Sequence, residues 1–452
     1  MNDKALKFPS LVWASAVLIL TLAMPSVLSA QTLSEVYRVA KREDMQYRAA
    51  LKSYDAALEK LPQARAGLLP VVNVSGNSSS QSGLAQFAGA AYVNREVQSW
   101  TWNAQITQPL IRWSTWVGYS QAGFQIEQAA AQLALAEQDV LLRSAQAFFD
   151  FMLAQENIRV SEAQLHAVNE QLLLAERNYA VGTGIITDVY EAKAKKSLTV
   201  AQRIAAVNEL ASKQAELDKI LGEPMALQSV RLTQSLPTVA ASQLNDGLNQ
   251  AMRNNPQVRV QVAALEVAKK EVTKSQSAHA PTLDLTYSRV GAYSSGSLSS
   301  PADLETRSYA NQAGLQLTVP LYAGGATQSK VRESLILRDK ADDELQGARR
   351  SATAQVRQAF AGVMNGQAQI EALQDAVDSG VQAVEANKIG FKIGTRINPE
   401  VLNAEQQLYG SMRDLMKARV DAVMQSLKLK AAMGTVQDQD LQALEALLLP
   451  TP

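Results

Sequence analysis

Cysteine is absent from the 452-residue sequence, and histidine occurs only twice. The first absence excludes disulfide bonds, thiol catalysis and cysteine-ligated zinc. The two histidines, His166 and His279, do not occupy equivalent positions in the internal repeat described below. No phosphate-binding loop, nucleophile elbow or metal-ligand spacing accompanies them. The sequence therefore predicts no enzyme, no cofactor and no metal site.

An excess of charge of one sign is also lacking. Lysine and arginine together number 43, as do aspartate and glutamate, so the formal net charge is zero. This balance gives no electrostatic indication of a nucleic-acid partner. Aromatic residues make up only 6% of the chain, while Gln, Ala, Leu and Ser are abundant. That composition suits long helices better than a compact mixed core.

Long hydrophobic runs are lacking after residue 30. The first thirty residues have two early lysines, an apolar run at 11–24 and small residues up to Ala30, which is typical of a cleaved secretory signal. The apolar run is shorter than the roughly 20 residues of a membrane-spanning helix, which argues against a retained anchor. No cysteine follows for a lipid anchor. A mature chain that crosses a membrane must therefore do so with β-strands.

The sequence contains an internal duplication. Residues 33–70 align with 244–281 at an offset of 211, and after one inserted residue the offset becomes 212, which places Gly182-Thr183 on Gly394-Thr395. A period this long is that of a duplicated half-molecule, since solenoid repeats are much shorter. We divide the chain into five parts: a signal peptide at 1–30, a first repeat at 31–222, a linker at 223–243, a second repeat at 244–434 and a C-terminal tail at 435–452.

Each repeat is predicted to begin with a helix and to continue into two strands. The helix covers 33–66 in the first copy, with a kink at Pro62. Alternation of apolar and polar residues predicts strands within 72–75, 100–107, 283–288 and 309–319, with polar loops at 77–98 and 290–306. Such alternation is typical of membrane barrel strands, with Trp100, Trp102, Tyr287 and Tyr309 at the membrane interface. The alternative is an amphipathic hairpin on a soluble core.

Four prolines mark the predicted junctions between strands and helices. Proline restricts the preceding residue to extended geometry and cannot continue a central strand's hydrogen bonds. The junctions are Pro70, Pro109, Pro281 and Pro320, and the last is followed by Gly324 and Gly325, which permit a tight turn out of the strand.

A long helix follows the strands in each copy. The helices at 113–180 and 326–392 would each be roughly 100 Å long at 1.5 Å per residue, which exceeds a globular core. A shorter helix, at 188–221 in the first copy, returns beside each. The chain would therefore pair each long helix with two short helices stacked end to end. Four strands cannot close a barrel in lipid, so two, three or four chains must associate.

Two turns interrupt these long helical patterns at matching positions. The first contains Val181, Gly182, Thr183 and Gly184, and the second contains Ile393, Gly394 and Thr395. In each turn a glycine can end one helix, and an acidic residue follows in the first turn of the next helix, Asp188 or Glu400. Each turn therefore joins the two arms of a helical hairpin.

The chain resembles the TolC family of outer-membrane efflux and type I secretion proteins. The resemblance rests on the duplicated helix–strand–strand–helix–helix order, on Pro320-Leu-Tyr-Ala-Gly-Gly325 and on the two turns. It implies an α+β membrane protein: a homotrimer with a twelve-stranded β-barrel, four strands per chain, continued by an α-helical coiled-coil tunnel in the periplasm. It also implies a location in the outer-membrane lipid of a Gram-negative bacterium. The tunnel tip would dock with a periplasmic adaptor protein and with an inner-membrane ABC transporter or proton-driven pump.

The resemblance also implies roles for residues at the tip. Thr187 and Asp188 would form a gate latch with Arg396, whereas Phe391 stands where the family has a tyrosine that bonds to the latch. Glu400 would supply one acidic ring at the constriction, and Asn403 replaces the second acid. Both departures predict a weaker latch and a weaker cation filter than the family pattern gives. The alternative is that Asp188 merely caps a helix and Arg396 is solvated.

The expected function is that of a passive, gated exit duct. The absence of a lipid-anchor cysteine favours type I protein secretion, and the alternative is the outer-membrane component of a small-molecule efflux pump. A secreted structural coiled coil is a further alternative, although it does not explain four alternating strands flanked by prolines.

Overall fold

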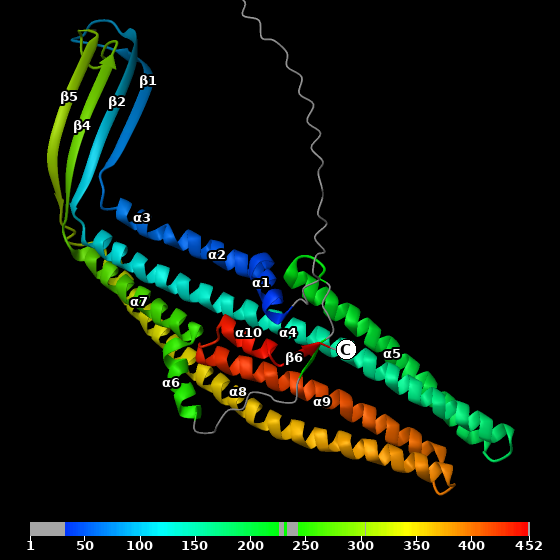
Figure 1. Ribbon diagram of the computed structural model, residues 1–452. Helices are drawn as coiled ribbons and strands as arrows, with labels where there is room; N and C mark the ends of the chain where they lie inside the picture. Colours follow the sequence, from blue (N-terminus) through cyan, green and yellow to red (C-terminus); the bar gives the residue numbers. More distant parts are fainter. Residues whose placement is uncertain (1–31, 226–229, 233–242, 303, 451–452) are drawn as a thin grey trace, which may run out of the picture.

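The structure is a computed structural model that describes residues 32–225, 230–232, 243–302 and 304–450. The predicted signal peptide lies outside these residues. A four-stranded sheet occupies one end of the elongated molecule, and long helices fill the rest (Figure 1). The two helical hairpins α4–α5 and α8–α9 end together at the pole opposite the sheet. The molecule therefore has a sheet end and a helical tip.

The two halves of the chain have the same element order. The first half consists of α1 (Leu33–Glu43), α2 (Met45–Leu58), α3 (Lys60–Ala66), β1 (Val71–Ala85), β2 (Val93–Ile111), α4 (Trp113–Ala180) and α5 (Ile186–Leu221). The second consists of α6 (Leu244–Asn254), α7 (Pro256–Gln276), the short 3₁₀ helix η2 (Ser277–His279), β4 (Thr282–Ser294), β5 (Thr306–Thr318), α8 (Ala326–Lys392) and α9 (Asn398–Met433). The internal duplication is thus confirmed.

The first helix of each repeat is broken, which the sequence pattern did not predict. In the first repeat the continuous helix at 33–66 is replaced by α1, α2 and α3, with breaks at Asp44 and Glu59. The kink expected at Pro62 is displaced to Glu59, because the proline lacks the amide that would bond to the carbonyl of Leu58. The second repeat breaks at Asn255, which is the position equivalent to Asp44.

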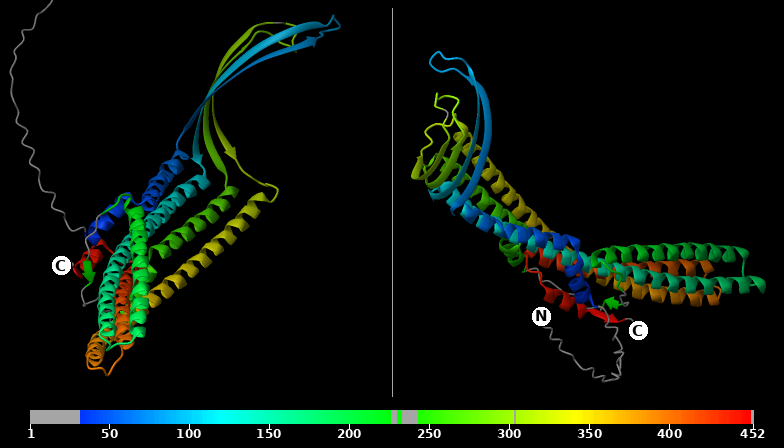
Figure 2. Two further views of the ribbon diagram at one scale, coloured as in Figure 1. Left: turned by 90° about the vertical axis from the view of Figure 1, so that its right-hand side faces the viewer. Right: turned by 90° about the horizontal axis from the view of Figure 1, so that it is seen from above.

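The sheet is antiparallel with the order β1-β2-β4-β5, so β2 and β4 join the two repeats. The strands contain 15, 19, 13 and 13 residues and are longer than predicted. The predicted loops at 77–98 and 290–306 were therefore too long, and the connections are 86–92 and 295–305. The Ser- and Gly-rich stretch of β1 pairs throughout with β2. The strands curve together away from the helices (Figure 2).

Three of the four junction prolines flank a strand, and one lies inside a strand. Pro70 and Pro281 directly precede β1 and β4, and Pro320 lies two residues beyond β5. Pro109 lies inside β2, so its prediction as the end of the strand was wrong. The register against β4 shifts between Pro109 and Ile111, and a bulge of this kind accommodates a residue that has no amide hydrogen.

Each long helix lies beside shorter helices that are stacked end to end, as predicted. The 68-residue α4 packs against α2 and α3 along one half and against α5 along the other, and α8 packs in the same way against α7 and α9. A large apolar cluster joins α1, α4, α5, α9 and α10 (Asp438–Glu445), with Phe149 fully buried within it. Beside it, β3 (Val230–Leu232) pairs with β6 (Leu448–Pro450). The linker and the tail are therefore joined to each other, which the sequence pattern did not indicate.

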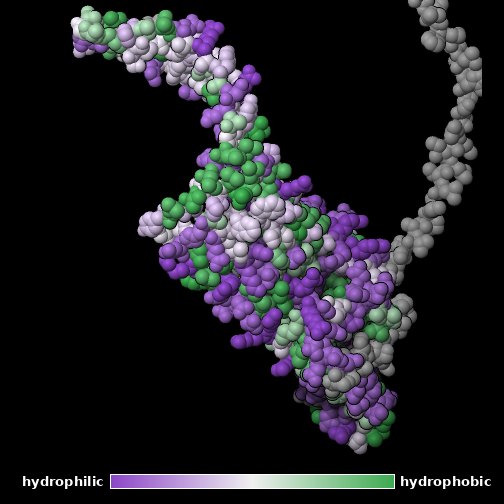
Figure 3. Space-filling view, turned by 90° about the vertical axis from the view of Figure 1, so that its left-hand side faces the viewer, coloured by the Kyte–Doolittle hydropathy of each residue, from purple (hydrophilic) through white to green (hydrophobic). Residues whose placement is uncertain are grey.

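Hydrophobic side chains gather where the sheet meets the helices, above a largely hydrophilic helical surface (Figure 3). The exposed apolar residues near this boundary include Trp113, Trp116, Leu321 and Tyr322, the last two 93% and 86% exposed. Aromatic and aliphatic side chains at such a boundary are typical of a membrane interface. Among the helices in the described part of the chain, none is both long and apolar enough to span a membrane.

Candidate gate at the helical tip

The two tip turns have the same backbone structure. Gly182 and Gly394 both have a φ of 77°, a left-handed conformation that favours glycine. The amide of Thr183 donates to the carbonyl of Asn178, and the amide of Thr395 donates to that of Gly390, each over 2.9 Å. Each pattern closes the last turn of a long helix. The duplicated sequence therefore produces two equivalent turns side by side.

Both turns present apolar side chains to solvent. Val181 and Ile393, at equivalent positions, are 73% and 69% exposed, and Ile185 and Ile397 are 62% and 58% exposed. Exposed aliphatic residues of this kind, gathered at one end of a molecule, are typical of a surface that binds another protein.

A pocket of about 700 Å³ lies between the two turns. It brings together Thr183, Gly184 and Asp188 of the first hairpin with Phe391, Gly394 and Arg396 of the second. Lys388 and Lys392 also line it. The structure therefore places the predicted latch residues Asp188 and Arg396, with Phe391, in one pocket, whereas Thr187 is exposed beside it.

Within one chain, Arg396 and Asp188 are not paired. An Arg396 guanidinium nitrogen lies 2.9 Å from a carboxylate oxygen of Glu400, which is in the first turn of α9. Among the described residues, the Asp188 side chain forms no hydrogen bond or ion pair, and burial raises the pKa of its carboxyl group. Asn403 is exposed on the same helix as Glu400. The single chain thus holds the two halves of the predicted latch apart.

A buried ion pair near the tip was missed by sequence reasoning. Lys388 Nζ of α8 lies 2.9 Å from Glu405 Oε1 of α9, and Glu405 is only 1% exposed. Burial lowers the pKa of Lys388, but the contact with Glu405, its negative charge and smaller effects of Tyr409 and Glu170 together outweigh burial, so the net pKa is raised. The equivalent residues of the first repeat are Glu176 and Lys193, which have the opposite charges. This reversed pair was the available sequence signal.

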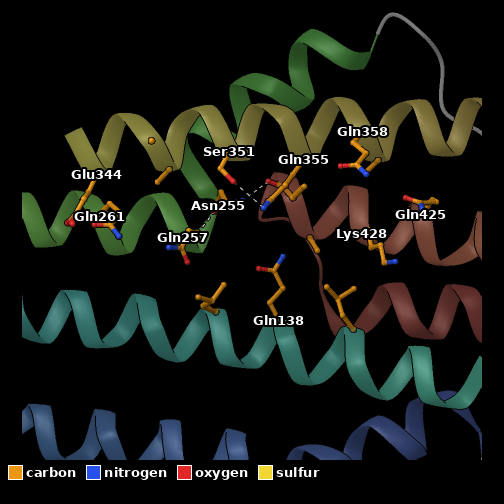
Figure 4. Close-up of a pocket in the computed structure, with 17 residues that line it drawn as sticks. Gln138, Asn255, Gln257, Gln261, Glu344, Ser351, Gln355, Gln358, Gln425 and Lys428 are labelled. Carbon is orange, nitrogen blue, oxygen red and sulfur yellow. Dashed lines mark hydrogen bonds between the residues drawn. The ribbon is translucent and has the colours of Figure 1, made fainter. Parts of the chain in front are cut away.

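A second pocket, of about 780 Å³, lies further up the helices where α7 meets α9 (Figure 4). Its lining comes from α4, α7, α8 and α9, and seven of its 17 residues are amides: Gln138, Asn255, Gln257, Gln261, Gln355, Gln358 and Gln425. Glu344 and Lys428 are the charged residues in its lining. Amides both donate and accept hydrogen bonds without carrying charge. Among the described residues, no group of acidic or histidine side chains could hold a metal ion.

Comparisons with known proteins agree with this architecture. The sequence model of the family "Outer membrane efflux protein" matches residues 36–223 and 247–435. The chain is 30% identical over 432 residues to the proteases secretion protein PrtF of Dickeya chrysanthemi, covering 94% of this chain and 92% of that protein. It is 29% identical over 428 residues to the outer membrane protein TolC of Vibrio cholerae serotype O1, covering 94% and 95%.

Solved structures of low sequence identity share the fold. CusC has a TM-score of 0.75 at 17% identity, over 90% of this chain and 93% of that chain. The outer membrane protein VceC of Vibrio cholerae has a TM-score of 0.74 at 18% identity, over 89% and 96%. The predicted fold class is confirmed for the single chain: it is mostly helical, with one four-stranded sheet and an internal duplication, and the solved channel proteins share this fold. The predicted outer-membrane location is confirmed too.

These matches also bear on activity, because they come from a family of channels rather than of enzymes. They support a channel for secretion or efflux. From the two family-model matches, which together cover most of the sequence, and from the near full-length relatives, the chain belongs to the outer membrane efflux protein family.

Proposed function

We propose that this protein is the outer-membrane exit duct of a type I protein secretion system. The observation that carries the proposal is the placement of the strands at one pole and of both hairpin turns at the other, with helices of 68 and 67 residues between them. At 1.5 Å per residue these helices extend roughly 100 Å into the periplasm. An inner-membrane transporter could then pass cargo directly to the cell exterior.

Polypeptide is the cargo that this duct fits. PrtF and the alkaline protease secretion protein AprF of Pseudomonas aeruginosa, which is 28% identical over 92% of this chain, are named as secretion proteins for proteases. The amide-rich pocket supports the same cargo, since glutamine side chains can form and exchange hydrogen bonds with an unfolded backbone without holding one charge type. A passive duct requires such weak, exchangeable contacts.

The tip turns are the docking site for a periplasmic adaptor in this proposal. Residues 181–184 of the first turn and 393–395 of the second lie at the pole far from the sheet. The exposed Val181 and Ile393 would be covered by the adaptor, which burial of apolar surface would stabilise. An ABC transporter in the inner membrane would complete the system.

The gate of the duct lies at the same tip. In the assembled trimer, Arg396 would exchange its partner Glu400 for Asp188 and Thr187 and hold the tip closed. Phe391 lines the pocket between them and contributes apolar contact without a hydroxyl. Glu400 and the neutral Asn403 would line the narrowest point, so the ring at Glu400 carries the cation preference.

Complementation of two kinds of host tests the cargo. The chain is expressed in cells that retain the adaptor and ABC transporter of a protease secretion system but lack its outer-membrane component. It is also expressed in cells that lack only the outer-membrane component of a proton-driven drug pump. Restored protease export into the medium is the expected result. Restored drug resistance without protease export would instead assign the chain to efflux.

Docking is measured by single-cysteine crosslinking, which the natural absence of cysteine makes unambiguous. A cysteine at Thr183 or Thr395 should crosslink to the adaptor, whereas one at Ala180 of α4, which is also exposed but precedes the turn, should react more weakly. Equal crosslinking at all three positions would contradict docking at the turns.

A further inference from the structure

The segment that follows β4, residues 295–301, is held at the end of the sheet by hydrogen bonds from one arginine. We call it the mouth segment. The guanidinium group of Arg95 on β2 donates to the carbonyls of Ser297 over 2.8 Å, of Pro301 over 3.0 Å, and of Ser300. The same guanidinium group lies 4.9 Å from the centre of the Phe87 ring in the β1–β2 connection. One side chain therefore joins the two outer loops of the chain.

The bonds of Arg95 are directed at backbone carbonyls. A guanidinium group is planar, remains charged and presents five donors, so it can bind several carbonyls at once. Charge-assisted hydrogen bonds are stronger than neutral ones. Further bonds fix the start of the segment, where Ser295 exchanges backbone and hydroxyl bonds with Gln98 of β2. The mouth segment is thus held along its length.

The mouth segment lies on the polar face of the sheet. Successive residues of a strand point to opposite faces, and β2 pairs with β1 without a register shift from residue 93 to residue 107. Trp100 and Ile106 lie on the apolar face, whereas Asn103 and Arg95 lie on the opposite, polar face. Because apolar residues of a membrane barrel face lipid, Arg95 and the segment that it holds face the lumen.

Burial along β2 agrees with this placement. Val97, which shares the face of Arg95, is only 7% exposed, whereas its neighbours Glu96 and Gln98 on the other face are exposed. Leu298 of the mouth segment reaches over Gly83 on β1, with its Cδ1 4.0 Å from the position of a Cβ there. Backbone and side chains of the segment therefore cover the lumenal face at the end of the sheet remote from the helices.

We propose that Arg95 holds the mouth segment inside the extracellular opening of the barrel, where three copies narrow the exit and set the size of molecules that can enter from outside. The same restriction would apply whether the channel exports proteins or small molecules. It makes Arg95 a positioning residue: its contacts place the loop, and the loop restricts passage.

Access to a cysteine below the mouth segment tests the proposal. Thr101 lies on the same, lumenal face of β2 as Arg95, six residues closer to the helices. The chain has no natural cysteine, so Thr101→Cys introduces a single reactive thiol. Intact cells are treated with a small charged thiol reagent and with a bulky polyethylene glycol maleimide, and the ratio of the two labelling rates is measured. Ala90→Cys, in the exposed β1–β2 connection, reports labelling without any barrier.

The bulky reagent should label Thr101→Cys much more slowly than it labels Ala90→Cys. Since hydrogen bonds to a charged donor are among the stronger ones in proteins, Arg95→Gln should raise the bulky-to-small ratio at Thr101→Cys roughly tenfold. Arg95→Lys keeps the charge but loses the planar set of donors, so its ratio should lie between those of the chain with Arg95 and of Arg95→Gln. Arg289→Gln is the matched control, because Arg289 is exposed on the opposite face of β4.

A second variant keeps the test decisive if Arg95→Gln fails to assemble. Leu298→Ser loosens the mouth segment without changing a strand, and should raise the same ratio. Equal labelling of Thr101→Cys by both reagents while Arg95 is intact would overturn the proposal, as would an unchanged ratio in assembled trimers that carry Arg95→Gln or Leu298→Ser.

Discussion

Asn255 joins two helices that are far apart in the sequence. Its Nδ2 donates a 2.9 Å hydrogen bond to the carbonyl of Ala432 at the end of α9, while its Oδ1 accepts from the amides of Gln257 and Val258 at the start of α7. The side chain is buried, at 4% exposed. One amide therefore caps α7 and also satisfies a terminal carbonyl of α9, so the two short helices stack end to end.

The first prediction concerns this dual role. Asn255→Asp keeps an acceptor for the α7 amides but cannot donate to Ala432, and an unpaired buried carbonyl costs about 1–3 kcal/mol. We expect a lower midpoint of thermal unfolding, followed by the helical circular dichroism signal in detergent. Asn254→Ala is the control, because Asn254 is exposed and its side chain has no hydrogen bond in the described part of the chain. A variant as stable as the parent would show that the junction does not depend on this donor.

The equivalent break in the first repeat is stabilised by charge. Asp44 caps α2 at the amide of Tyr47 and binds Arg143 of α4 through two bonds of 3.0 and 3.1 Å. In the second repeat the same two positions hold Asn255 and Gln355. The first junction therefore contains an ion pair, whereas the equivalent positions of the second junction hold neutral amides.

The second prediction is a pH dependence confined to the first junction. Burial raises the pKa of Asp44, but the bonds from Arg143 and from the Tyr47 amide outweigh it and hold the pKa below its usual value. A depressed folded-state pKa stabilises the protein above the unfolded pKa of about 4, and this stabilisation is lost as the pH falls through the folded value. Asp44→Asn should therefore be less stable than the parent at neutral pH, with the difference shrinking in acid.

Thermal midpoints of the parent and Asp44→Asn, measured from about pH 7 to about pH 3, check this dependence. The double change Asp44→Asn with Arg143→Gln copies the second junction, and it should recover part of the loss because no guanidinium group is left without its partner. A difference between parent and variant that stays constant with pH would exclude the ion pair as its cause.

Local sequence pattern predicted the long elements well and the broken first helix poorly. The bounds of α4 and α8 agree with the expected 113–180 and 326–392, because helical periodicity continues from the strand junctions to a glycine turn. The break at Asp44 has a tertiary cause. In α1, residues such as Leu33 and Val36 are fully buried in the central cluster, whereas α2 has no buried residue. The chain turns there to reach the core, which a local pattern does not encode.

At the strands and at the tip, too, the sequence predicted some features and not others. The Ser- and Gly-rich part of β1 has low strand propensity, yet it pairs with β2 because its neighbour supplies the hydrogen bonds. At the tip, the duplicated turns were predictable from the sequence alone. The contact between Arg396 and Glu400 joins residues only four apart in the sequence, the first in the tip turn and the second in the first turn of α9. A contact between Arg396 and Asp188 depends on the association of chains, which no spacing within one sequence specifies.

The third prediction addresses that latch. If each exposed Arg396–Asp188 pair contributes about 0.5 kcal/mol in the closed trimer, three pairs contribute about 1.5 kcal/mol, or roughly tenfold in the ratio of closed to open channels. Arg396→Ala should therefore raise the mean single-channel conductance in planar bilayers. Arg177→Ala, in the last turn of α4, removes the same charge from the first hairpin and serves as the control. Unchanged conductance in Arg396→Ala would remove Arg396 from the gate.

The fourth prediction concerns Glu400, which has two opposing effects. Glu400→Gln removes the negative ring at the constriction, so cation selectivity and block by multivalent cations should fall. It also releases Arg396 from its partner within the chain, so the closed state should become more populated. Reversal potentials in a salt gradient measure the first effect, and the open fraction measures the second. Selectivity equal to that of the parent would show that Glu400 does not line the narrowest point.

The fifth prediction compares two equivalent glycines. Gly222 ends α5 and Gly434 ends α9, with φ values of 79° and 70°. An alanine at either position destabilises the protein by roughly 1–2 kcal/mol, because the backbone there is left-handed.

The surroundings of the two glycines differ. At Gly222 the added Cβ would meet only the Glu43 side chain, at 3.5 Å, whereas at Gly434 it would lie 2.4 Å from backbone atoms of Asn254. Backbone at the α6–α7 break cannot move aside without disturbing the Asn255 junction, so a clash adds about 1–3 kcal/mol. Gly434→Ala should therefore unfold at a clearly lower temperature than Gly222→Ala, and equal midpoints would contradict the tight packing of α9 against that break.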